Sequence, residues 1–527
     1  MGWLHDAGVA EIYERDVALL NLLLDAMGQR GMPISLDKRV EAAATLEADR
    51  VAAMAEIQRL VPPECCPTKL YATQRPNAEA VITTVPVPYC TYCCARRPNR
   101  KHTCWKTTDP SYDVRDETQT KWRLRLPFVP SPKGLLAYFR LKGYTIPSKY
   151  DRATGERRET TDEAALLRLA LRTEDPLLAA VLRYRGVDKE LSTYVGRPVK
   201  GGVEGGLIAG PDSLVRTVFT HDPSTLRLAS KAPALMNLPR EGVVRRCFEA
   251  PPGYTFWACD FAGIENIIVG WLARSERYVR LSKLDMHSFY TAYAKYELEQ
   301  AIPYADLPQE GWSDDQLRAA LKAIKTRWPA DRQANKKQIH GGNYMEGPGM
   351  VQEQILKDSG VVVPLRQLKR LQAFYFELFP EIRAWQRRVV GLSEDGPPLE
   401  PWEGAYQKGY LRTPFGNIHR YYDVLTHVRG PKGWELRPST DAKRAVAFVP
   451  QSCGRFVLTR AAQRLPLRTQ DTLRLFIHDE MLGLSPDAEV AHCVQDATAA
   501  MTAPIPELGG LSLPVEAKTG RVWGEMR

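Results

Sequence analysis

The sequence predicts an α+β chain in which one strand and a distant β-hairpin bring acidic residues to the same edge of an antiparallel sheet. The first observation is the apolar, β-prone run 254–261, which carries Asp260 close to its end. The second is the segment 472–484, in which two apolar runs flank a polar turn that contains Asp479. Two such runs around a tight turn are typical of a β-hairpin. The third is helical periodicity outside these strands, as in the apolar-faced segment 17–27.

Asp260 and Asp479 are the candidate metal ligands of this edge. An acid at the end of a buried strand is costly unless it is paired or binds a metal ion. A capping role explains Asp260 alone equally well, but Asp479 supplies a second carboxylate for the same place. Two carboxylates that share hard cations such as Mg²⁺ are what in-line phosphoryl transfer by two metal ions requires.

A third element lies between these two. Arg332, Lys336, His340 and Tyr344 recur every four positions, so on a helix they form one slowly rotating stripe. Two cations, an imidazole and a phenol suit a triphosphate with its base and sugar. For Arg332 and Lys336 alone, a solvated basic helix face is the alternative.

These three blocks, in this order, resemble motifs A, B and C of the family A DNA polymerases, the DNA polymerase I class, in a phage-like form. Motif A corresponds to 260–265, motif B to 332–344 and motif C to 478–480. The resemblance implies a right-hand fold of α+β class, with an antiparallel palm sheet, helical fingers and thumb, and a small Cys-rich insertion. It divides the chain into an N-terminal helical segment 1–61, a Cys-rich insertion 62–125, thumb and start of palm 126–240, palm with motif A 241–284, fingers with motif B 285–400, and palm with motif C 401–527.

The resemblance also implies the catalytic centre. Asp260 and Asp479, helped by the backbone carbonyl of Phe261, would hold two Mg²⁺ ions, and Glu480 would be an auxiliary acid. Lys336 is the candidate proton donor to the leaving pyrophosphate.

The resemblance implies that Arg332 and Lys336 contact the phosphates of the incoming nucleotide. Lys337 is a less favoured candidate than Lys336 for the proton donor. His287 lies in a match to the family's Asp-x-His and faces the same phosphates.

Selection of the sugar falls to another group of residues. Glu265 stands where a ribose 2′-OH would collide, so it is the expected steric gate, and Tyr344 packs beneath the nascent base pair. His340 stands where the family usually has Phe or Tyr, which stacks on the incoming sugar and base. Gly341 and Gly342 follow inside the expected helix, each costing about 1 kcal/mol relative to Ala.

The primer-template contacts implied by the resemblance are Arg227, Asn237, Gln451 and His478. Gln451 matches a residue that reads the minor-groove side of the primer terminus. Minor-groove acceptors sit at similar places on every base pair, so such a contact tests pairing without reading sequence. The arginines at 245–246 are further candidates, or surface arginines near a loop.

Six of the ten cysteines lie between positions 65 and 104. Cys90 and Cys93 have the spacing of a zinc knuckle, and Cys66 (or Cys65) with Cys104 would complete a four-thiolate structural Zn²⁺ site. Unbound thiols are the alternative. Disulfides are the less expected use of such a cluster in a cytoplasmic protein.

Composition agrees with a nucleic-acid partner. The chain has 527 residues and a formal net charge of +10, the sign expected for binding a polyanion. The basic run 96–101 is a candidate phosphate contact or a solvated loop. No secretory leader and no apolar run of about 20 residues is apparent, so we expect no membrane partner and a cytoplasmic location, that of a bacterial host if phage-encoded.

The expected substrates are primed DNA and dNTPs. Only about a dozen residues precede the first helix, whereas a proofreading exonuclease domain needs on the order of 100. We therefore expect proofreading, where present, to come from a separate exonuclease or replication protein. Two alternatives stay open: a single-subunit RNA polymerase-like enzyme, and a non-catalytic, zinc-bearing DNA-binding protein on a polymerase scaffold.

Overall fold

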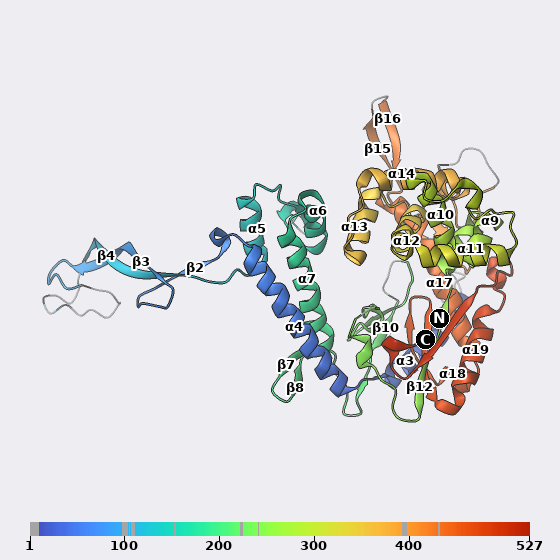
Figure 1. Cartoon of the computed structure of the whole chain (residues 1–527), viewed down its shortest axis with the longest axis horizontal. Helices are drawn as coiled ribbons and strands as arrows, with labels where there is room; N and C mark the ends of the chain where they lie inside the picture. The colour runs from blue at the N-terminus through green and yellow to red at the C-terminus, as the bar shows by residue number, and fades with distance from the viewer. Residues whose placement is uncertain are drawn as a thin grey trace. The chain divides into compact units, whose positions relative to one another are not determined.

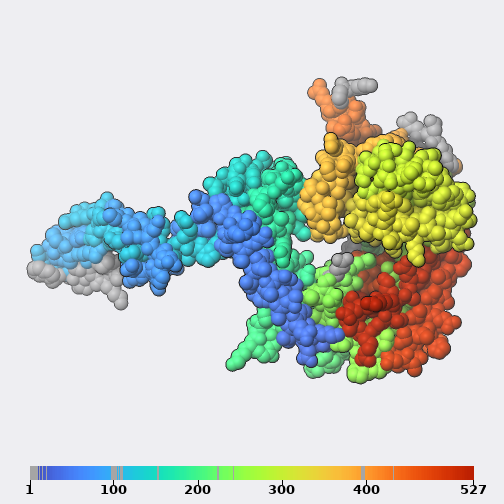
Figure 2. All heavy atoms as spheres, viewed as in Figure 1, coloured from blue at the N-terminus to red at the C-terminus, as the bar shows by residue number. Residues whose placement is uncertain are grey.

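The computed structural model of the chain describes residues 10–96, 104, 106, 111–151, 154–221, 225–240, 242–392, 398–430 and 433–527. The chain divides into two compact units, Met1–Ala48 with Val187–Arg527 and Asp49–Gly186. The larger unit holds a four-stranded sheet and most of the helices, and the smaller one holds a group of helices and a long β-ribbon (Figure 1). The atoms of the ribbon form a narrow arm of the smaller unit in Figure 2. Within the part of the chain that the structure describes, no helix is long and apolar enough to cross a membrane.

The sheet of the larger unit is antiparallel, with strand order β17-β18-β12-β19. Its strands are β12 (Tyr254–Phe261), β17 (Leu473–Ile477), β18 (Glu480–Pro486) and β19 (Val515–Gly520). The predicted hairpin is confirmed, because β17 pairs directly with β18. Trp257 of β12 is fully buried opposite Gly483 of β18, where a Cβ atom would lie 2.2 Å from the indole ring. Only glycine leaves room for this tryptophan in the centre of the sheet.

Helices continue from the sheet and cover it. α8 (Ile264–Leu272) begins shortly after β12, and its first turn carries Glu265. α17 (Thr440–Gln463) packs against α8, and α19 (Val490–Thr502) packs against β12 and α17. These contacts belong to one hydrophobic core that runs through the larger unit.

A second group of helices carries motif B. It comprises α9 (Glu276–Leu284), α10 (Met286–Glu299), α11 (Asp314–Arg327), α12 (Pro329–Asn343), α13 (Pro348–Ser359), α14 (Leu365–Leu378) and α15 (Pro380–Val390). α12, which starts with a proline suited to a first helical turn, packs against α10, α13 and α14 (Figure 1). The predicted helical stripe is confirmed, with Tyr344 as the residue that ends the helix.

The two glycines near the end of α12 are needed for this packing. A Cβ on Gly341 would lie 2.5 Å from Cγ2 of Val351 in α13, and one on Gly342 would lie 2.8 Å from the ring of Tyr375 in α14. Glycine at these two positions weakens the helix locally, but the absence of side chains allows α12 to lie close against two neighbouring helices.

The smaller unit has a core of its own. The end of α4 (Leu36–Leu60) packs with α5 (Pro132–Leu141), α6 (Glu163–Thr173) and α7 (Pro176–Glu190) around buried leucines and aromatic residues. Between α4 and α5 the chain forms an antiparallel ribbon, β2 (Thr68–Tyr71), β3 (Glu79–Cys90) and β4 (Tyr112–Arg125), in the order β2-β4-β3.

Short elements complete the fold. They are α2 (Ala10–Tyr13), α3 (Leu19–Arg30), α16 (Ala405–Lys408), α18 (Leu467–Gln470), and the strand pairs β1 (Met32–Pro33) with β9 (Leu214–Val215), β5 (Ser148–Asp151) with β6 (Glu156–Glu159), β7 (Arg197–Val199) with β8 (Gly202–Glu204), β10 (Val218–Thr220) with β11 (Ala229–Lys231), β13 (Tyr410–Arg412) with β14 (Ile418–Arg420), and β15 (Leu425–Gly430) with β16 (Gly433–Pro438).

Candidate active site

Asp260 and Asp479 meet at one edge of the sheet, as predicted. Asp260, near the end of β12, pairs in register with Glu480, the first residue of β18. The carbonyl of Asp479 accepts a hydrogen bond of 3.3 Å from the backbone N–H of Phe261. His478 closes the β17–β18 turn with a left-handed backbone, φ 57°. Residues that are more than 200 positions apart in the sequence therefore form one acidic cluster.

The protein leaves these carboxylates poorly compensated. Burial, and then repulsion from Asp479, raises the pKa of Asp260 to about 7. Burial, and then repulsion from Asp260, raises the pKa of Glu480 to about 7, and burial also raises the pKa of Asp479. One oxygen of Asp260 and one of Glu480 are buried without a hydrogen-bond partner among the described residues. Carboxylates with free lone pairs are the ligands that Mg²⁺ prefers, so this cluster fits a divalent-cation site.

The stripe of α12 presents one cation that is free of acidic partners. Lys336 forms no ion pair with the described residues, whereas its neighbour Lys337 lies 2.5 Å from Asp358 of α13. Desolvation, together with Arg240 and Arg332, lowers the pKa of Lys336. A lysine that holds its proton less tightly is a better proton donor, and this geometry favours Lys336 over Lys337 for that role.

Arg332, at the start of the stripe, is held by Asp285. Its Nη2 donates to Oδ1 of Asp285 at 2.9 Å, and its Nε donates to Oγ of Ser288 at 3.0 Å. Burial opposes ionisation of Asp285, but hydrogen bonds from Arg332 and Ser288 hold the pKa of this carboxyl below its usual range. His287 lies between these residues in α10, and burial, with Lys336 and Arg332, lowers its pKa to about 3. The imidazole is therefore neutral at physiological pH.

Glu265 gathers three of the other predicted residues. One of its carboxylate oxygens forms an ion pair with Arg227. The other lies 3.3 Å from Nε2 of His340 and accepts a hydrogen bond of 3.3 Å from the hydroxyl of Tyr344. The rings of His340 and Tyr344 also meet edge to face, with centroids 4.8 Å apart.

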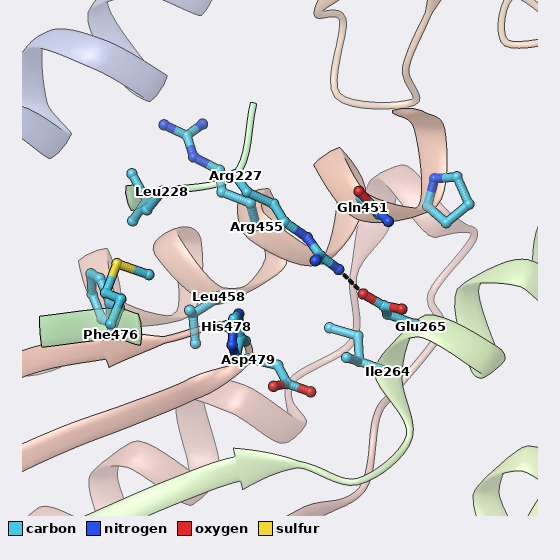
Figure 3. A pocket seen from close by; sticks show the side chains of 13 residues that line it. Arg227, Leu228, Ile264, Glu265, Gln451, Arg455, Leu458, Phe476, His478 and Asp479 are labelled. Atoms are coloured by element: carbon cyan, nitrogen blue, oxygen red, sulfur yellow. Dashed lines mark ion pairs between the residues drawn. The ribbon is translucent and has the colours of Figure 1, made fainter. Parts of the chain in front are cut away.

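A cavity of about 50 Å³ lies beside this group. It is lined by Glu265, Gln451, His478 and Asp479 together with apolar side chains, and the Arg227–Glu265 pair reaches across it (Figure 3). The cavity thus joins the acidic cluster to the Glu265 group within one site.

The four predicted primer-template residues have different surroundings. Gln451 of α17 and the exposed His478 line the cavity, and Gln451 lies beside the hydroxyl of Tyr344. Arg227 also lines it but is bound to Glu265. Asn237 lies outside the cavity lining, exposed at the end of a short 3-10 helix, Leu235–Asn237.

Two cations of the site escaped sequence reasoning. Arg240 acts on the acidic cluster and on Lys336, since it lowers the pKa of both Asp260 and Lys336. Lys518 acts on Asp260 from β19. Arg240 stands alone in a loop and Lys518 lies on a strand that we did not predict, so no sequence pattern marked either residue.

The cysteine cluster is a separate candidate metal site in the smaller unit. The sulfur atoms of Cys90, Cys93 and Cys104 lie within 4.8 Å of one another. Neither Cys66 nor its alternative Cys65 joins them, and the side chains of both pack against the core of α4–α7 at the base of the ribbon. The expected set of four thiolates is therefore corrected to three among the described residues, and His102 lies outside those residues.

Comparison with known proteins connects this geometry to a family. No protein-family profile matches the chain. The DNA polymerase of Escherichia phage T5 is 25% identical over 297 residues, which cover 54% of this chain and 31% of that protein. The thermostable DNA polymerase I of Thermus aquaticus is 24% identical over 379 residues, covering 70% of this chain and 38% of that protein. The chain thus resembles the polymerase domain of the family A DNA polymerases.

The fold of the chain matches a solved structure over almost its whole length. The POL domain of Pol1 from M. smegmatis, in complex with DNA primer-template and dNTP, superimposes with a TM-score of 0.61 at 18% identity. The match covers 99% of this chain and 72% of that one. The chain spans only about a third of the length of the two curated relatives named above.

Proposed function

We propose that this chain is a template-directed DNA polymerase that adds dNTPs to a primer 3′-OH. The observation that carries the proposal is the cluster of Asp260, Asp479 and Glu480. Two of its buried oxygens have no hydrogen-bond partner among the described residues, and it lies near Lys336, which forms no ion pair with them. A site of this kind suits a polyphosphate with bound cations. The sheet would serve as palm, residues 285–400 with α10 to α15 as fingers, and the region 126–240 as thumb and start of palm.

In this proposal Asp260, Asp479 and the carbonyl of Phe261 hold two Mg²⁺ ions, with Glu480 as an auxiliary acid. When bound, such ions lower the pKa of the primer 3′-OH and neutralise the charge of the triphosphate and the leaving pyrophosphate. Lys336 contacts the phosphates and gives its proton to the leaving pyrophosphate.

The remaining residues of the stripe orient the nucleotide. Arg332 contacts the phosphates from a position fixed by Asp285, and the neutral His287 adds a hydrogen bond. Glu265 excludes a ribose 2′-OH, and Tyr344 anchors Glu265 from beneath the nascent base pair.

Primer extension tests the proposal. Wild-type protein with a primed template, Mg²⁺ and single nucleotides should add the complementary dNTP, and Asp479→Ala should abolish the addition. Asp315→Asn, an exposed acid of α11 outside the site, is the control and should retain activity. Extension with rNTPs in preference to dNTPs would indicate an RNA polymerase. Duplex binding without any extension would indicate a non-catalytic DNA-binding protein.

We also propose that Cys90, Cys93 and Cys104 bind a structural Zn²⁺ ion. The turn that carries Cys90 and Cys93 supports this proposal, because Cys94 N–H bonds to the carbonyl of Cys90 at 2.8 Å and Cys94 has φ 58°. Hydrogen bonds from the backbone and from the other two thiols outweigh burial and lower the pKa of Cys90 to about 6. Thiolates are the form that binds zinc.

A further inference from the structure

The β2-β4-β3 ribbon is firmly attached to the core of the smaller unit. The side-chain amide of Gln58 in α4 both donates to the carbonyl of Phe128 at 2.7 Å and accepts from its N–H at 2.9 Å. Leu126 N–H donates a hydrogen bond to the carbonyl of Pro67 at 2.8 Å, which connects the segment that enters the ribbon to the segment that leaves it. Phe128 itself is buried in that core. The ribbon is therefore held in a fixed orientation relative to its own unit.

Within the part of the smaller unit that the structure describes, no helix lies against the faces of the ribbon (Figure 1). The side chains of β3 and β4 are mostly exposed or half-buried, and those that are buried lie towards Cys90 at the far end. A sheet that exposes both faces contributes little core. This exposure indicates a contact surface.

The base of the ribbon, defined here as residues 68–80 and 121–125, is strongly basic. Its cations are Lys69, Arg75, Lys121, Arg123 and Arg125, and Glu79 is its single acid. None of the five cations forms an ion pair with a described residue, although Lys69 and Arg75 contact the ring of Tyr71. The far end differs, because Arg96 pairs with Glu117 and Arg115 pairs with Asp113.

Three of these cations form one row. Lys121, Arg123 and Arg125 alternate along β4 with Trp122 and Leu124, so they project from the same face. Their spacing along the strand is about 6.7 Å, so three cations lie within about 13 Å on one face. A row of cations without ion-pair partners among the described residues is complementary in charge to a phosphate backbone.

We propose that the base of the ribbon is a second DNA-contacting surface, which binds the phosphate backbone of the duplex through Lys121, Arg123 and Arg125. This inference rests on the proposed function, since the duplex is the primer-template itself. It adds a contact outside the active site that strengthens binding of DNA of any sequence, because phosphate contacts carry no sequence information.

The test is the salt dependence of duplex binding. A labelled primer-template is titrated with the full-length chain at several KCl concentrations, for wild type and for the triple variant Lys121→Gln, Arg123→Gln, Arg125→Gln. Each lost phosphate contact reduces the slope of log Kd against log salt by about 0.9, so three contacts reduce it by about 2.7. The triple variant should show this reduction and bind more weakly at low salt.

A charge-matched control uses cations of the same unit that are already ion-paired. Arg140 pairs with Glu159, Lys149 with Asp162 and Arg183 with Asp49. Changing all three cations to Gln removes the same formal charge and should leave the slope close to that of wild type. An unchanged slope in the ribbon variant, or an equal reduction in the control, would overturn the proposal; the former would leave an acidic protein as the better candidate partner.

Measuring nucleotide insertion distinguishes a failure of this inference from a failure of the proposed function. At saturating duplex the ribbon variant should insert a single nucleotide at the wild-type rate, because its substitutions lie outside the catalytic cluster. A wild-type chain that binds duplex but never extends a primer would refute the polymerase proposal, and the salt slopes would still decide the role of the ribbon.

Discussion

Replacing Gly342 with alanine should destabilise the larger unit, although alanine is the better helix former. Intrinsic propensity favours alanine by about 1 kcal/mol in a helix interior. The new Cβ would lie 2.8 Å from the ring of Tyr375, which is fully buried and bonds through its hydroxyl to Asn343 at 2.6 Å and Tyr278 at 2.8 Å. The ring cannot move away without breaking these bonds. Overpacking of a dense core costs typically about 1–3 kcal/mol and a broken buried hydrogen bond about 1 kcal/mol, so the net change should be a loss of about 1–3 kcal/mol.

The measurement is urea unfolding followed by circular dichroism, with Gly349→Ala as the matched control. Gly349 lies in the first turn of α13, in the same unit, and nothing lies within 4 Å of the position of its Cβ. Alanine there should leave the midpoint unchanged or raise it slightly. The reasoning is refuted if Gly342→Ala unfolds at the same urea concentration as Gly349→Ala or at a higher one. We also expect slower nucleotide insertion by Gly342→Ala, since α12 carries the nucleotide-binding stripe.

Three further predictions concern the proposed chemistry. Glu265→Ala should raise rNTP incorporation relative to dNTP at least about tenfold, or roughly 1.4 kcal/mol, in a competition assay; unchanged selectivity would remove its role as steric gate. Without metal ions, the free energy of unfolding should fall by several kcal/mol as the pH rises from 5 to 8, roughly 2.7 kcal/mol for each of the two carboxyls at about 1.36 kcal/mol per pH unit between pH 5 and 7. The folded pKa of these carboxyls is about 7 and the unfolded pKa is near 4, so over that range they hold their protons in the folded chain but not in the unfolded one. Mg²⁺ should reverse this loss, and Asp260→Asn should flatten the dependence. Cys93→Ser should abolish the zinc content measured by mass spectrometry of the purified protein, and wild-type protein purified without zinc would refute that site.

The acidic edge could be predicted from the sequence because its signals are local. A buried strand that ends near Asp260 and a hairpin with Asp479 in its turn are each marked by apolar runs in the sequence. Together these runs restrict the strand order and register that a sheet can adopt. The stripe on α12 was predictable for the same reason, since residues four positions apart lie on the same face of a helix. In both cases the structure confirms the geometry.

The contacts that complete the site depend on tertiary packing, which leaves no local pattern. Arg240 and Lys518 are single cations without a motif, and β19, which carries Lys518, reads as polar because its side chains are largely exposed. The strand pairs β5–β6 and β15–β16, which we did not predict, are likewise rich in polar residues. The spacing of Cys90 and Cys93 correctly predicted that their thiols lie together. Which further cysteines reach this pair depends on the path of the intervening chain, which the spacing does not give.

His340 shows how this site accommodates a departure from the family that the chain resembles. A phenyl ring at this position could stack but could not bond to Glu265, whereas the imidazole Nε2 lies 3.3 Å from the Glu265 carboxylate. Burial, together with nearby cations such as Arg227 and Lys336, lowers the pKa of His340. One carboxylate oxygen of Glu265 thus lies close to His340 and accepts a hydrogen bond from Tyr344, and the other pairs with Arg227. A polar residue in the stacking position therefore gives the proposed gate a further polar neighbour on α12.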